Sequence, residues 1–152
     1  MSHPPIPRQH AAHLIRRCNR VGGAIIAIAP ALAAMNTIAG LLAGGALGAI
    51  TISSGITGAG LALLSGLILR NATTHLRGPY VNEPRARTVR RVLAFLCVAT
   101  ALCYTGLLVA AFAIGVTATA FPLLLLNTFP TALAATAAIT STQVLRRPGP
   151  DR

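Results

Sequence analysis

Negatively charged residues and tryptophan are what this sequence lacks most clearly. Its 152 residues include 13 arginines and no lysine, but only two acidic side chains, Glu83 and Asp151, and no tryptophan. Two acids in separate segments offer no carboxylate pair for acid–base catalysis, and the sequence contains no P-loop, GxSxG or HExxH signature. We therefore expect a protein that is not an enzyme and that uses no cofactor and no metal ion.

Cysteine is also too scarce for a disulfide framework, since the chain has three. Cys97 and Cys103 fall within an apolar stretch, where a thiol usually acts as a small packing residue. Cys18 follows Arg16 and Arg17 just before the first apolar stretch, a position typical of S-palmitoylation. Cys18 is therefore a candidate acylation site, and an unmodified thiol is the alternative.

Charge is absent from two long blocks, Val21–Leu69 and Val92–Leu145. A soluble helix shows charge along its outer face, and neither block has such a face. About 20 apolar residues cross the hydrocarbon core of a membrane, so each block is long enough for two spans and a tight turn. The sequence therefore predicts an all-α integral membrane protein with four transmembrane helices arranged as two hairpins.

The turn residues divide each block into two spans. In the first block we place the turn within residues 44–50, although Thr51–Gly55 is a second turn-rich candidate. In the second block the turn is expected near Thr117–Pro122, with a kink at Pro130 in the following span. The first, third and fourth spans are then 21–43, 92–116 and 123–145, and the second ends near Leu69.

The arginines predict how the chain crosses the membrane. The segment 1–20 carries a charge of +4, the loop 70–91 carries +5 and the tail 146–152 carries +2. With four spans all three segments lie on one side, which the positive-inside rule identifies as the cytoplasm. Arginines that flank spans orient the protein and meet anionic head groups, so the net charge of +11 does not indicate a nucleic-acid partner.

Small and polar residues inside the spans are candidates for helix packing. Asn36 and Asn127 lie at a similar depth, about 22–27 Å from the basic side at 1.5 Å per residue. They are a candidate pair for a bond across a helix interface, and the alternative is that both side chains reach interfacial water. The small-xxx-small pattern of close helix contact occurs twice. Its two ladders are Gly40, Gly44 and Gly48, and Gly58, Ala62 and Gly66.

Part of the chain resembles a family of small four-span envelope and egress proteins of alphaherpesviruses, which partner glycoprotein K. The similarity extends from Tyr80 to Ala111. The third span shares Cys97 and Val98 and the run Leu108–Ala111, while Arg20, Val21 and Pro30 resemble the first span more faintly. In the loop, the matching residues are Tyr80, Val81, Asn82, Arg85 and Arg87.

The resemblance implies a function that span counting does not provide. It implies binding to an envelope glycoprotein of the glycoprotein K type, with roles in its trafficking, virion egress, envelopment and control of fusion. The five matching loop residues would be partner contacts. The protein would occupy host Golgi, trans-Golgi, nuclear and plasma membranes and the virion envelope. Two alternatives stay open: a self-assembling pore of the viroporin or holin type, and a non-catalytic bacterial membrane subunit.

The topology makes a prediction for the sequon Asn71-Ala72-Thr73. Because the loop 70–91 is expected on the cytoplasmic side, Asn71 should stay unglycosylated when the protein is expressed in mammalian cells. The measurement is the electrophoretic shift on N-glycosidase treatment. A variant with a sequon-bearing insert within 44–50 is the control and should shift. Glycosylation at Asn71 would show that the predicted topology is inverted.

Overall fold

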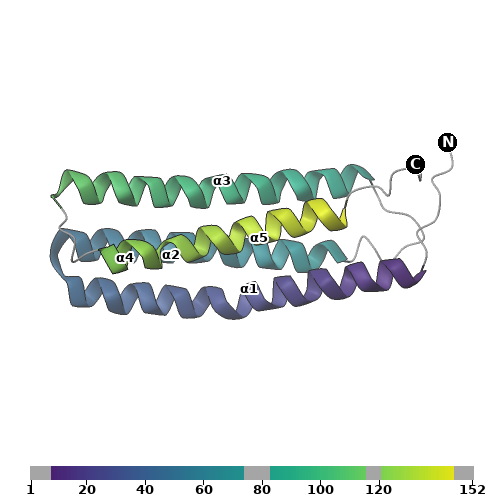
Figure 1. Ribbon diagram of the computed structural model, residues 1–152, viewed down its shortest axis with the longest axis horizontal. Coiled ribbons are helices and arrows are strands. Elements are labelled where there is room, and N and C mark those ends of the chain that lie inside the picture. Colours follow the sequence, from purple (N-terminus) through teal and green to yellow (C-terminus); the bar gives the residue numbers. More distant parts are fainter. Residues whose placement is uncertain (1–7, 74–82, 116–120, 146–152) are drawn as a thin grey trace.

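The described part of the chain is helical throughout, apart from short connections. A computed structural model describes residues 8–73, 83–115 and 121–145 (Figure 1). Four of its helices are long and apolar enough to cross a membrane, which confirms the all-α, four-span prediction. The helices are α1 (Arg8–Ala43), α2 (Gly45–Asn71), α3 (Glu83–Ala113), α4 (Phe121–Leu126) and α5 (Thr128–Val144).

The helices form a bundle in which α2 and α5 pack on each other and α1 and α3 lie on opposite sides of this pair (Figure 1). Both α1 and α3 contact α2 and α5. The starts of α1 and α3 and the ends of α2 and α5 lie together, and we call this the basic end because the arginines gather there (Figure 1). The sequential helices therefore pair as hairpins, as expected.

Helix α1 is longer than the span expected from the sequence. It has 36 residues and begins at Arg8, so the basic segment before Val21 is largely helical. At 1.5 Å per residue it is about 54 Å long, while the hydrocarbon core is about 30 Å thick. Its first turns therefore extend beyond the hydrocarbon. Pro30 lies inside α1 without ending it, as a membrane helix tolerates.

The first hairpin turns at Gly44, within the range 44–50 that the sequence favoured. Gly44 and Gly45 have φ values of 63° and 55°, a conformation that side chains with a Cβ rarely adopt. The alternative turn at Thr51–Gly55 is wrong, since these residues lie inside α2. Their hydroxyls bond to the helix itself, with Ser53 Oγ donating to the Ile50 carbonyl at 3.1 Å.

Glycines bring α1 and α2 into backbone contact at both ends of the hairpin. A Cβ on Gly40 would lie 2.8 Å from the Gly48 carbonyl oxygen, and one on Gly48 would meet the Gly40 carbonyl. Near the basic end, a Cβ on Gly22 would lie 2.9 Å from the Gly66 carbonyl. We call these two pairs, with Gly55 between them, the glycine seam.

The glycine ladders of the sequence are only partly packing faces. Gly44 was expected to pack with Gly40 and Gly48, but nothing lies within 4 Å of the place where its Cβ would be, and it forms the turn instead. The second ladder divides between two neighbours, because α2 packs on several helices. Gly66 meets α1, whereas a Cβ on Gly58 would lie 3.2 Å from Pro130 Cβ of α5. Ala62, between them, is fully buried.

The glycine seam predicts an asymmetric response to adding one methyl group. Gly48→Ala should destabilise the protein by about 1–3 kcal/mol, because its Cβ would overlap the α1 backbone and force the helices apart. Gly60→Ala on the exposed side of α2 is the matched control and should not destabilise, since nothing lies within 4 Å. Thermal unfolding in detergent micelles measures both, and equal loss of stability would contradict the seam.

Candidate functional site: the polar interior and the basic end

Most buried hydroxyl groups are satisfied within their own helix. Thr51 donates to the Leu47 carbonyl at 2.8 Å, and Ser65 donates to the Leu61 carbonyl at 2.9 Å. Such i−4 bonds let polar side chains enter an apolar interior without leaving a donor unpaired. These residues therefore fill the bundle as small packing residues, and the hydrogen bonds of their hydroxyl groups stay within α2.

Hydrogen bonds join the last span to each of its three long neighbours. One goes to α1, one to α3 and one to α2, so polar contacts fix the last span against all three other long helices. From the basic end inward, they are Arg17 Nη2 to Gln143 Oε1 at 2.6 Å, Thr131 Oγ1 to Thr100 O at 3.4 Å, and Ser54 Oγ to Asn127 Oδ1 at 3.3 Å.

The two asparagines do not form the candidate bond with each other. Asn36 Nδ2 donates to the Leu32 carbonyl of its own helix at 2.9 Å, and its Oδ1 has no hydrogen-bond partner within the described ranges. The side chain packs against Gly55, where a Cβ would overlap it. Asn127 instead accepts from Ser54. The physical reason is that Asn36 is held against the glycine seam, on the α2 side of α1.

The last span is interrupted at Asn127. Helix α4 ends at Leu126 and α5 begins at Thr128, so the kink that the sequence predicted at Pro130 falls three residues earlier, within the single candidate span Leu124–Val144. Proline has no amide hydrogen, and its ring clashes with the carbonyl four residues earlier, here that of Leu126. The interruption therefore falls just before the proline and places the buried amide of Asn127 in the interior.

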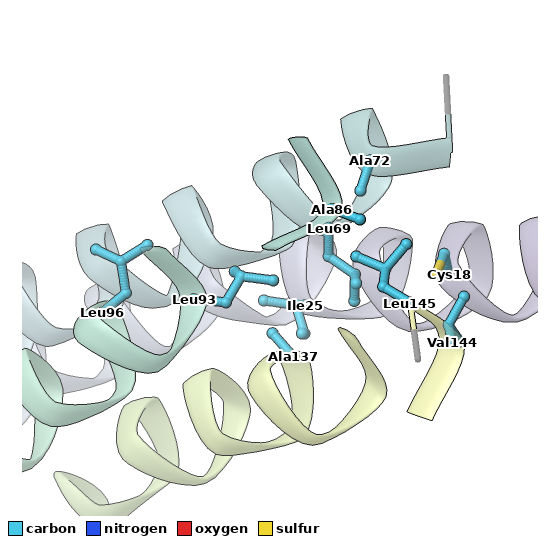
Figure 2. Close-up of a cluster of buried hydrophobic side chains, with 10 residues drawn as sticks. All are labelled: Cys18, Ile25, Leu69, Ala72, Ala86, Leu93, Leu96, Ala137, Val144 and Leu145. Carbon is cyan, nitrogen blue, oxygen red and sulfur yellow. The ribbon is translucent and has the colours of Figure 1, made fainter. Parts of the chain in front are cut away.

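At the basic end, arginines surround a buried apolar cluster. The described arginine side chains of this end are exposed or half-buried, on α1, α2 and α3. The chain has 13 arginines and two acids, so no internal arrangement neutralises them. Figure 2 shows the cluster between these helices and α5; it consists of Cys18, Ile25, Leu69, Ala72, Ala86, Leu93, Leu96, Ala137, Val144 and Leu145.

Cys18 belongs to this cluster, and its burial favours the unmodified thiol over acylation. Its exposed fraction is 0%, and its side chain lies among Val144, Leu145 and Leu69 (Figure 2). Acyl transfer requires an accessible thiol, since the thiolate is the nucleophile. In the folded bundle Cys18 is therefore an apolar packing residue. It lies on the side of α1 that meets Val144 and Leu145, whereas Arg20 is on an exposed side of the same helix.

The remaining predicted residues are only partly placed. Tyr80, Val81 and Asn82 lie outside the described residues. Arg85 and Arg87 are exposed near the start of α3, and Asn71 is the exposed last residue of α2, at the basic end. Within the described ranges, no three His, Cys, Asp or Glu residues come together to form a metal site.

These features define the class of the protein. Four long apolar helices packed as adjacent pairs, with an apolar outer surface and arginines at one end, make it a multi-span integral membrane protein. The outer surface includes Leu42, Phe95 and Phe112, which are 84%, 70% and 77% exposed. Comparisons of the chain with known protein families, curated proteins and solved structures found no match.

Several residues that hold the bundle together were not predicted from the sequence. Gly22 and Gly55 contact the neighbouring helix, although neither was assigned to a packing ladder. A signal was present for Gly55, because Gly48, Gly55 and Ala62 recur at seven-residue spacing on α2. The bond between Arg17 and Gln143 had no sequence signal, since it depends on how α1 and α5 align.

The bond between Ser54 and Asn127 predicts a measurable coupling. In a double-mutant cycle with Ser54→Ala and Asn127→Ala, the coupling energy should be about 0.6 kcal/mol, the average for such bonds in membranes. Ser53→Ala replaces Ser54→Ala in the control cycle and should show no coupling to Asn127, because the Ser53 hydroxyl is exposed and bonds within α2. Reversible unfolding in mixed micelles provides the free energies, and equal coupling in both cycles would refute the contact.

Proposed function

We propose that this chain is a non-catalytic membrane protein that binds a second multi-span membrane protein through α3. The outer face of α3 carries this proposal, because α3 is the least buried of the four long helices. In the alphaherpesvirus family that the sequence resembles, the partner is glycoprotein K. The function would then be partner trafficking, virion egress, envelopment and control of membrane fusion.

The exposed residues of α3 form one face at helical spacing. Phe95, Val98, Leu102, Val109 and Phe112 follow each other at three, four, seven and three residues, and all are exposed. Gly106 lies between Leu102 and Val109, and nothing lies within 4 Å of the place where its Cβ would be. A large apolar face with a glycine at its centre suits the close approach of another transmembrane helix.

The resemblance supports the same helix. It covers Tyr80 to Ala111, which includes most of α3, and two of its residues, Val98 and Val109, lie on the exposed face. Arg85 and Arg87, also part of the resemblance, are exposed where α3 begins. A partner could therefore contact the apolar face within the membrane and the arginines at its surface. On this proposal the protein would reside in host Golgi, nuclear and plasma membranes and in the virion envelope.

The experiment is affinity capture of the tagged full chain from its native source in mild detergent, followed by mass spectrometry. We expect one multi-span viral glycoprotein at about one-to-one stoichiometry. Gly106→Val should reduce its recovery about tenfold, because the added side chain keeps a partner helix away. Gly60→Val is the matched control, since Gly60 is an exposed glycine on α2 with equally open surroundings, and recovery should not change.

Other results would replace the proposal. Recovery of the chain alone, as a defined oligomer that conducts ions after reconstitution, would identify a self-assembling pore. Recovery of a bacterial membrane complex would identify a non-catalytic subunit of that complex. Equal losses from Gly106→Val and Gly60→Val would show that α3 is not the binding face.

A further inference from the structure

Helices α1 and α2 are in contact near the basic end, and a groove runs along each side of this contact. On one side α1 faces α5, as shown by the bond between Arg17 and Gln143 and by the packing of Leu14 and Val21 against the buried cluster. The groove on the opposite side of the contact faces away from α5, toward the surrounding lipid. We call it the outer groove.

Helix geometry places particular residues along the outer groove. Gly22 faces α2 directly, and successive residues of an α-helix are rotated by about 100°. On α1, Arg16, Asn19 and Gly23 therefore lie on the flank away from α5, whereas Arg20 points away from α2. On α2, Arg70 lies on the matching flank, and its Cβ would be 3.2 Å from a Cβ on Gly22.

The surroundings of these residues agree with an open groove. Arg16 and Arg70 are exposed, and Asn19 and Gly23 are half-buried. Nothing lies within 4 Å of the Cβ position of Gly23. Arg16 and Arg70 therefore flank the mouth of the outer groove, and Gly23 below them leaves one wall without a side chain.

The depth of the mouth matches the membrane surface. The charge-free part of α1 begins at Val21, and the charge-free part of α2 ends at Leu69. Arg16 and Arg70 thus flank the boundary between hydrocarbon and head groups, where lipid phosphate groups lie. Arginine suits phosphate because its planar guanidinium donates two parallel hydrogen bonds.

Electrostatics favour an external anion at this place. Arg16 and Arg20 are four residues apart on α1, so their like charges repel along the helix. The chain has too few acids to relieve this repulsion across its 13 arginines. An anionic lipid supplies the missing negative charge and also fills the apolar groove with an acyl chain, which a nucleic acid or an acidic soluble peptide does not do.

We propose that the outer groove binds one anionic phospholipid, with Arg16 and Arg70 holding its phosphate and Asn19 contacting the head group, while an acyl chain lies over Gly23. This site is separate from the outer face of α3, so it does not depend on the proposed partner. A site that holds one lipid in a defined place differs from the general attraction of basic segments to anionic membranes.

The test is native mass spectrometry of the purified full chain in detergent, titrated with phosphatidylserine or phosphatidylcholine. We expect phosphatidylserine to bind first and more tightly. Arg16→Gln/Arg70→Gln should weaken the first binding event about 100-fold, about tenfold for each arginine, because each variant loses a charge-assisted hydrogen bond to the phosphate. Arg85→Gln/Arg91→Gln removes the same charge from two exposed arginines of α3, outside the groove, and should change it less than about twofold.

A second variant tests the groove without altering charge. Gly23→Leu should weaken phosphatidylserine binding about tenfold by filling the groove, while Gly60→Leu on the exposed side of α2 should not. Circular dichroism and thermal unfolding verify that each variant remains folded.

Three results would overturn the site. Equal weakening by the two arginine pairs would show diffuse charge attraction alone. Equal affinity for phosphatidylcholine would remove the role of the anionic head group. Displacement of the lipid by millimolar O-phosphoserine or inorganic phosphate would show that the arginines bind a free phosphate and that the groove does not hold a lipid.

Discussion

The absence of water from the hydrocarbon core is the constraint on which this structure depends. Every backbone amide and carbonyl there must bond within its own helix, and apolar helices gain no hydrophobic free energy by packing together rather than against lipid. Close van der Waals contact must then supply much of the association. The glycine seam provides such contact between α1 and α2, because Gly40 against Gly48 and Gly22 against Gly66 allow the two backbones to touch.

The two hairpins use this constraint differently. The first is held by backbone contact along the seam, with its turn fixed by the positive φ of Gly44. The last span is joined to its neighbours by the hydrogen bonds of Asn127, Thr131 and Gln143. Neither device covers the outer side of α3. That helix is consequently the least buried of the four long helices.

The sequence was sufficient for the architecture, because charge and chain length determine it. Two charge-free blocks, each flanked by arginines, predicted four spans, and a glycine pair predicted the first turn. The contacts inside the bundle were harder to predict. Each span is apolar on all sides, so its sequence does not mark the face that points inward. For this reason the contact of Gly22 with Gly66 and the bond of Asn127 to Ser54 were not predicted.

The most direct test of the glycine seam is solid-state NMR of the protein in bilayers with only its glycines labelled with carbon-13. Through-space correlations then arise only between glycines that are close together. The glycine seam predicts cross-peaks between Gly40 and Gly48 and between Gly22 and Gly66, in addition to those between sequence neighbours. Cross-peaks from sequence neighbours alone would contradict the glycine seam and the hairpin built on it.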